Sequence, residues 1–180
     1  SNSKTIQITT DGELNQIING ATDWVYEEEF GLTQAFFWST DGKKIAFYKF
    51  DEREVKEFSM DMFNAELYPS QYKFKYPKAG EDNSKLSIHI YNFDDGETTM
   101  ISLNKSYEYI PRMNWTKSND LLYFLAMNRH QNELDFILYN TINSSSEILF
   151  SEKDKYYIDV HDNTCLLYTS DAADEAGRGG

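Results

Sequence analysis

The chain has 180 residues, of which 40% are hydrophobic and 16% aromatic, and its formal net charge at pH 7 is −13. This composition suffices for one globular unit, and the acidic balance excludes a nucleic-acid-binding protein, which needs a basic surface to neutralise phosphates. No apolar run approaches the roughly 20 residues of a membrane-spanning helix, and the polar start at residues 1–4 does not resemble a signal peptide. We therefore expect no membrane contact from this chain.

The first twenty residues predict two strands. Residues 4–9 (KTIQIT) alternate between polar and apolar side chains, and an Asp-Gly turn signal follows at 11–12. A second apolar run at 15–18 ends at an Asn-Gly pair. Together these segments would close one structural unit.

Three adjacent glutamates, Glu27, Glu28 and Glu29, follow among large aromatic residues. At about 4 Å each pair of carboxylates repels by roughly 1 to 4 kcal/mol, depending on the local dielectric, so a fold that holds them close needs a compensating cation. In a strand Glu27 and Glu29 would share a face, whereas in a helical turn Glu28 and Glu29 could both reach a ligand beyond its end. The run indicates a cation site on a short helical or irregular segment, with a solvated acidic turn as the alternative.

Residues 34–50 predict a β-hairpin. An aromatic strand (QAFFWS) leads into an Asp-Gly pair at 41–42, which suits the positive φ values of a tight turn, and the strand KIAFYKF follows at 44–50. This second strand is apolar on both faces, which is expected of a strand that is covered on both sides.

An internal repeat places Trp115 on Trp38 and residues 115–124 on 38–47, at a constant offset of 77 residues. Propeller blades take about 40 to 50 residues, so the offset indicates a large insertion, for which 51–80 is the candidate. Its central FSMDMF run predicts a strand, and its aromatic residues indicate burial rather than a floppy loop.

The remaining chain predicts a hairpin and then a four-stranded meander. Residues 86–93 and 98–103 flank an Asp-Asp-Gly turn. Strands of the meander are expected near 112–116, 121–127, 133–140 and 147–150, and residues 156–160 would begin another unit. The fold class is all-β, and at about 40 to 50 residues per blade the chain would supply three to four blades.

Other patterns are weak. His89, His130 and His161 lack the close spacing of a metal site, and His89 on an alternating strand indicates a structural hydrogen-bonding role. The sequence contains no Gly-x-Ser-x-Gly nucleophile motif and no phosphate-binding glycine loop. We expect no catalytic residue, no metal site and no cofactor in this chain.

Three motifs carry a resemblance to a known family: DWVYEEE at 23–29, FWSTDG at 37–42 and YPKAG at 76–80. With them the chain is similar to the N-terminal β-propeller domain of the dipeptidyl peptidase IV family, within the prolyl oligopeptidase family. The resemblance implies an all-β fragment of an eight-bladed propeller, a partial propeller of four-stranded antiparallel blades. It also implies that the insertion near 51–80 is an arm used in homodimer contacts.

The same resemblance implies a function. In that family the second and third glutamates of the motif hold the free N-terminal ammonium of a peptide substrate, so the role falls on Glu28 and Glu29. The intact protein would be a serine exopeptidase that releases dipeptides with proline, or less well alanine, at the second position. Its catalytic Ser, Asp and His would lie in a separate hydrolase domain, so this chain alone should be inactive. Bacterial relatives are usually periplasmic or secreted, so the resemblance implies a periplasmic or secreted location for the intact protein.

Two other interpretations of the acidic run stay open. A non-catalytic propeller could use it to dock a basic protein partner, because one fold hosts many functions. A Ca²⁺ site agrees less well, because consecutive glutamates differ from the spaced carboxylates of a calcium loop.

The last sixteen residues, 165–180, resemble one reading frame of a transposase-adapter oligonucleotide used in sequencing libraries. We expect them not to be natural and place the domain at 1–164. Cys165, the single cysteine, then lies outside the natural part, which leaves neither disulfide nor thiol chemistry to consider.

Overall fold

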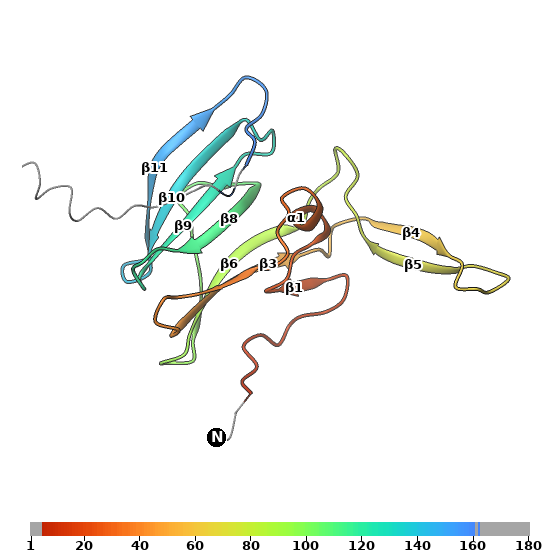
Figure 1. The fold of residues 1–180 in the computed structure, drawn as a ribbon, viewed down its shortest axis with the longest axis horizontal. Coiled ribbons are helices and arrows are strands. Elements are labelled where there is room, and N and C mark those ends of the chain that lie inside the picture. Colours follow the sequence, from red (N-terminus) through yellow and green to blue (C-terminus); the bar gives the residue numbers. More distant parts are fainter. Residues whose placement is uncertain (1–4, 161, 163–180) are drawn as a thin grey trace, which may run out of the picture.

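A computed structural model describes residues 5–160 and 162. This part of the chain is built almost entirely from antiparallel strands, with one short helix, α1 (Trp24–Glu28). The strands form two large sheets and a two-stranded arm (Figure 1).

The first sheet is organised around β3 (Lys44–Asp51), which pairs on one side with β6 (Lys85–Asn92), and β6 pairs with β7 (Thr98–Met100). On the other side of β3, two short strands share one edge. β1 (Ile17–Asn19) pairs with 49–51, and β2 (Phe36–Trp38) pairs with 45–47. The segment between them, which contains α1, is therefore inserted into a single edge strand.

The second sheet is a meander in the order β11-β10-β9-β8. Its strands are β8 (Tyr109–Trp115), β9 (Leu121–Met127), β10 (Glu133–Asn140) and β11 (Ser145–Lys153). Trp38 pairs with Ile45 in the first sheet and Trp115 pairs with Leu122 in the second. Each member of the second pair lies 77 residues after its counterpart in the first pair, so the sequence repeat is confirmed as a structural one.

The main core lies between the two sheets. Tyr48 and Phe50 of β3 are fully buried, as are Leu122 and Phe124 of β9. Alternate residues of β3 point to its other face, where Phe47 packs in a smaller cluster. Burial of β3 on both faces confirms the prediction made from its continuous apolar pattern.

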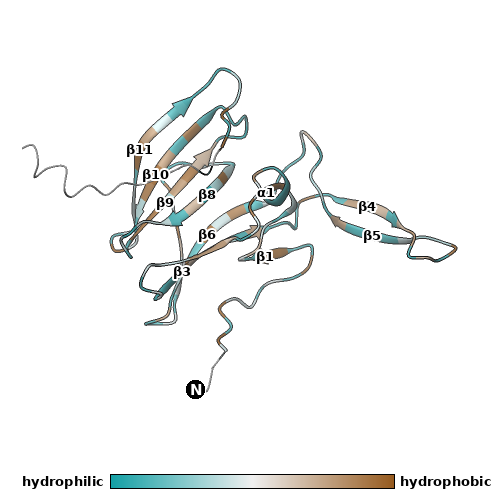
Figure 2. Cartoon of the chain, viewed as in Figure 1, coloured by the Kyte–Doolittle hydropathy of each residue, from teal (hydrophilic) through white to brown (hydrophobic). Residues whose placement is uncertain are grey.

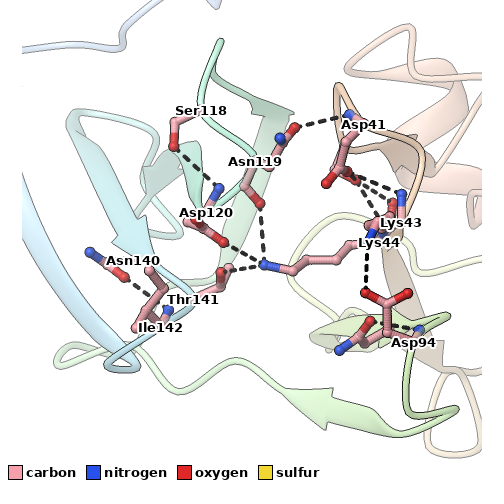
Figure 3. A network of polar contacts seen from close by, with 12 residues as sticks. Asp41, Lys43, Lys44, Asp94, Ser118, Asn119, Asp120, Asn140, Thr141 and Ile142 are labelled. Carbon is pink, nitrogen blue, oxygen red and sulfur yellow. Dashed lines mark hydrogen bonds and ion pairs between the residues drawn. The ribbon is translucent and has the colours of Figure 1, made fainter.

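A polar junction joins the turns of the two sheets (Figure 3). Lys44 Nζ donates to Asp120 Oδ1 at 2.7 Å and to Thr141 Oγ1 at 3.1 Å, and the backbone N–H of Asp41 donates to Asn119 Oδ1 at 2.9 Å. Lys44 comes from the first sheet and its acceptors from the second. These contacts fix one sheet against the other at this end.

The insertion forms a hairpin arm of β4 (Glu57–Met62) and β5 (Ser70–Lys75) that projects away from both sheets (Figure 1). The prediction that the aromatic residues of the arm are buried is wrong. Tyr72 is 57% exposed and Tyr68 80% exposed, because β4 and β5 pair only with each other and no further layer within the described residues covers them. The arm thus presents hydrophobic segments to solvent (Figure 2).

Three expectations differ from the structure. Residues 5–9 and 156–160 are not strands, since within the described part of the chain no strand pairs with them. The same part of the chain forms two blade-like sheets rather than three to four blades. The number is lower because the residues of the arm and of the segment around α1 belong to neither of these sheets. The expected boundary at 164, the segment 165–180 and His161 lie outside the described residues.

Candidate functional site

The acidic motif forms α1, and its helical start is fixed by Asp23. The Oδ1 atom of Asp23 accepts a hydrogen bond from the backbone N–H of Tyr26 at 2.9 Å, the usual N-cap contact. Its Oδ2 atom accepts from Ser84 Oγ at 2.6 Å, which ties the helix to the segment before β6. Burial raises the pKa of Asp23, although both hydrogen bonds favour the charged form.

The helix stops after Glu28 because the chain turns at Gly31. Glu29 is the C-cap residue, and Gly31 has φ +62°, a conformation that side chains with a Cβ rarely adopt. The turn lets the N–H of Leu32 donate to the carbonyl of Tyr26 at 2.9 Å. Sequence and geometry thus confine the acidic run to one turn of helix.

The aromatic residues of the motif face the core. Tyr26 is 3% exposed and Phe30 is 8% exposed, and their ring centroids lie 5.2 Å apart. Tyr26 also packs edge-on against Phe50 at 4.9 Å, and Phe30 against Tyr109 at 5.4 Å. The aromatic rings therefore anchor the turn beneath the carboxylates.

The three glutamates point outward, and all are exposed. Within residues 5–160 and 162, no side chain forms a hydrogen bond or an ion pair with Glu28 or Glu29. They also stand at the C-terminal end of α1, where free carbonyls already carry negative partial charge and cations are preferred. Negative charge is disfavoured at this end of a helix, so an incoming cation would offset the charge of the two carboxylates.

A hollow of about 560 Å³ lies beside α1, on the side of the arm. Trp24 and Glu27 line it from α1, Glu52 from the end of β3, and Tyr72 and Phe74 from the arm. Glu28 and Glu29 are not among its lining residues, so the sequence-predicted pair faces another direction.

His89 plays a structural part. His89 Nε2 lies 3.0 Å from Ser87 Oγ, its ring stacks on Phe47, and burial lowers its pKa. This confirms the structural role expected for His89. Among the described residues, no cluster of three or more His, Cys, Asp or Glu side chains has the geometry to hold a metal ion.

Sequence reasoning missed the contacts that hold α1 in place. An Asp three residues before Tyr26 is an N-cap signal that could have located the start of the helix. Ser84 and the backbone of Ile110, to which the motif also bonds, carry no such signal because they are distant in the sequence.

Comparison with known proteins settles the family. The model for the "Dipeptidyl peptidase IV (DPP IV) N-terminal region" matches residues 1–177. The chain belongs to the dipeptidyl peptidase IV family. It is a partial β-propeller of the N-terminal region of that family, as its motifs and its antiparallel sheets indicated.

Comparisons with individual proteins support the same family. The chain is 28% identical to venom dipeptidyl peptidase 4 of Apis mellifera over 98% of its own length, and 30% identical to dipeptidyl aminopeptidase B of Saccharomyces cerevisiae, also over 98%. The crystal structure of dipeptidyl peptidase 4 from Porphyromonas gingivalis superposes with a TM-score of 0.82 at 42% identity over 86% of the chain. The chain spans 25%, 22% and 22% of these three proteins, respectively.

Proposed function

We propose that this chain is the substrate-binding propeller part of a serine-type dipeptidyl peptidase, and that Glu28 and Glu29 hold the N-terminal ammonium of the peptide. The observation that carries the proposal is the state of these carboxylates. Both are exposed, neither has a partner among residues 5–160 and 162, and both stand at the end of α1 that disfavours negative charge. The relatives named above are dipeptidyl peptidases and a dipeptidyl aminopeptidase.

An ammonium group suits two neighbouring carboxylates. It carries three N–H donors, so each glutamate can accept a charge-assisted hydrogen bond, which is stronger than a neutral one. An N-acylated peptide lacks this charge and would be rejected. The pair would thus select substrates with a free N-terminus.

The anchor would also determine where the peptide is cut. Two residues of extended chain span about 7 Å, at roughly 3.5 Å per residue. With the ammonium held at Glu28 and Glu29, the bond after the second residue is presented to a nucleophilic serine of a separate hydrolase domain. The products are dipeptides with proline, or less well alanine, at the second position.

The test is made in the full-length protein that contains this chain. Changing Glu28→Gln and Glu29→Gln together should lower kcat/KM for a Gly-Pro substrate by roughly 30-fold or more, because loss of a paired charge costs about 2 kcal/mol or more. Glu27→Gln is the matched control, since Glu27 belongs to the same exposed run but lines the hollow on the other side.

We expect Glu27→Gln to keep kcat/KM within about twofold, which is about 0.4 kcal/mol. An unchanged specificity constant in the double variant would show that Glu28 and Glu29 do not bind the substrate.

A second candidate function is a non-catalytic propeller that docks a basic protein through the acidic run. It is favoured by one relative, the inactive dipeptidyl peptidase 10 of Mus musculus, which is 34% identical over 72% of the chain. The net charge of −13 also suits a basic partner. If the purified full-length protein shows no hydrolysis of dipeptide substrates and the glutamate variants instead weaken binding of a basic protein, this function replaces the first.

The place of action that we propose is outside the cytoplasm, in the periplasm or in secreted form. Support comes from the venom enzyme among the relatives. Within the described residues, no helix is sufficiently long and apolar to cross a membrane. Fractionation of the source cells, with activity assayed in each fraction, tests this placement.

A further inference from the structure

Strand β8 contains a bulge directly beneath α1. Its register with β9 passes from Tyr109 opposite Met127 to Arg112 opposite Leu125, so Ile110 and Pro111 together stand opposite Ala126. A bulge of this kind leaves backbone groups outside the ladder. Ile110 is 7% exposed and Pro111 is fully buried, so these groups need partners within the protein.

Two tyrosines from outside the second sheet provide hydrogen-bond partners for the bulge. The N–H of Ile110 donates to Tyr26 Oη at 2.8 Å, and Tyr48 Oη donates to the carbonyl of Ile110 at 3.0 Å. Both rings are buried. The two bonds are alike in length and burial, but Tyr48 belongs to β3 whereas Tyr26 belongs to α1. One residue of the bulge therefore links the acidic turn to the second sheet.

The same strand holds the far end of the turn. Arg112, directly after the bulge, donates from Nη1 to the carbonyl of Phe30 at 2.9 Å and to that of Pro111 at 2.8 Å. Its Nε atom forms an ion pair with Asp162 at 2.6 Å. The contact with the turn is made by Nη1. Tyr26 and Phe30 thus bracket Glu28 and Glu29, and each is tied to β8.

A helix of five residues is not stable alone, because the conformational entropy lost in nucleation exceeds the stabilisation from so few hydrogen bonds. Its position depends on tertiary contacts. Asp23, held by Ser84, sets where α1 begins, at the end of the helix opposite to Glu28 and Glu29. The long-range hydrogen bonds made by Tyr26 and Phe30, which precede and follow the glutamates in the chain, are those with Ile110 and Arg112 of β8.

We propose that the β8 bulge positions the ammonium site, with Tyr26 and Arg112 as positioning residues that orient Glu28 and Glu29. The proposal rests on the proposed function of the two glutamates. It assigns to the second sheet a part in substrate binding, although none of its residues needs to contact the substrate. A displacement of a charged anchor by about 1 Å can change a rate a hundredfold, so loss of one such contact should be measurable.

The experiment compares Tyr26→Phe with Tyr48→Phe in the full-length protein. Each variant removes one hydroxyl that bonds to Ile110, so each should lower the melting temperature. We expect Tyr26→Phe to raise KM for a Gly-Pro substrate about tenfold and to leave kcat within about twofold, as lost binding does. Tyr48→Phe should leave KM unchanged.

Coupling to the glutamates supplies a second measurement. If Tyr26 acts through Glu28 and Glu29, then Tyr26→Phe should have no further effect on KM in a protein that already carries Glu28→Gln and Glu29→Gln. An effect of the same size in both backgrounds would overturn the proposal, as would an equal rise in KM for Tyr26→Phe and Tyr48→Phe.

Arg112→Lys provides an independent variant should Tyr26→Phe fail to fold, because lysine keeps the charge but lacks the forked donors. A rise in KM supports the proposal and an unchanged KM overturns it. Failure of the positioning role and failure of the proposed function would give different results. If the glutamate variant loses affinity while Tyr26→Phe and Arg112→Lys do not, only the positioning role is wrong. If the glutamate variant keeps its kcat/KM, the proposed function fails and the positioning role fails with it.

Discussion

Asp23 is a buried carboxylate with both oxygens occupied, and its removal from water raises its pKa. The Asp23 carboxyl group therefore binds a proton more tightly in the folded protein than in the unfolded chain. Stability contributed by Asp23 falls as pH rises from the ordinary value of 3.8 through the raised value.

Asp23→Asn keeps an N-cap side chain and removes the titration. In the full-length protein, we expect the melting temperature of this variant relative to wild type to increase as pH rises through that interval. Asp51→Asn is a contrasting control. Arg53 lowers the pKa of Asp51 to about 2, so its stabilising effect is present above the unfolded value and is lost as pH falls towards 2. Parallel curves for wild type and Asp23→Asn would contradict the assignment.

At the residue scale, sequence reasoning located the acidic run but not its surroundings. The family resemblance, and not the spacing, pointed to Glu28 and Glu29. The spacing of the glutamates was compatible with either a strand or a helical turn. The direction of the neighbouring aromatic residues could not be predicted, and Tyr26 and Phe30 are buried in the core. Which side of a five-residue helix is buried depends on long-range partners such as Ile110.

At the element scale, Lys44 is one of the polar links between the two sheets (Figure 3). Lys44→Met would leave Asp120 and Thr141 without their shared donor. We expect a loss of about 1 kcal/mol in the free energy of unfolding, since the pair is partly exposed. Lys43→Met is the matched control, because Lys43 pairs with Asp94 within one sheet and both are largely exposed.

Thermal melting of the full-length variants compares these two lysines. Lys44→Met should lower the melting temperature more than Lys43→Met does. Equal shifts would mean that the junction contributes no more than a surface ion pair.

Strands were predictable where alternation and turn signals coincide. Residues 121–127 and 133–140 were predicted from pattern and are the observed β9 and β10. The strand expected at 4–9 was wrong over its described residues 5–9, because a pattern indicates which face can be buried but not whether a hydrogen-bonding neighbour is present. The arm was located correctly, yet its exposure could not be predicted, since aromatic content alone does not reveal what covers it.

At the scale of the whole molecule, the arm leaves hydrophobic side chains in solvent. Phe63, Leu67 and Tyr68 at its tip are 69%, 85% and 80% exposed. Exposed groups of this kind mark interaction surfaces. We propose that the arm packs against a second copy of the intact protein to form a homodimer.

The triple variant Phe63→Ser, Leu67→Ser and Tyr68→Ser should convert a dimer of the full-length protein into a monomer, as measured by light scattering. The tip lies far from the strands of both large sheets, so activity per folded chain should be retained (Figure 1). An unchanged mass would exclude the arm tip as the dimer contact.

The shared edge of β3 has one further consequence. Because β1 and β2 pair with adjacent stretches of the same strand, the chain leaves the sheet after Asn19 and re-enters it at Phe36 without disturbing its neighbours. The segment that carries Glu28 and Glu29 is thus a single insertion in this edge of the sheet. Sixteen residues, from 20 to 35, lie between the two edge strands, while β3 keeps its pairing on both sides of the insertion. If Glu28 and Glu29 bind the substrate ammonium as proposed, grafting this insertion together with the β8 bulge into another propeller should transfer selectivity for free amino termini.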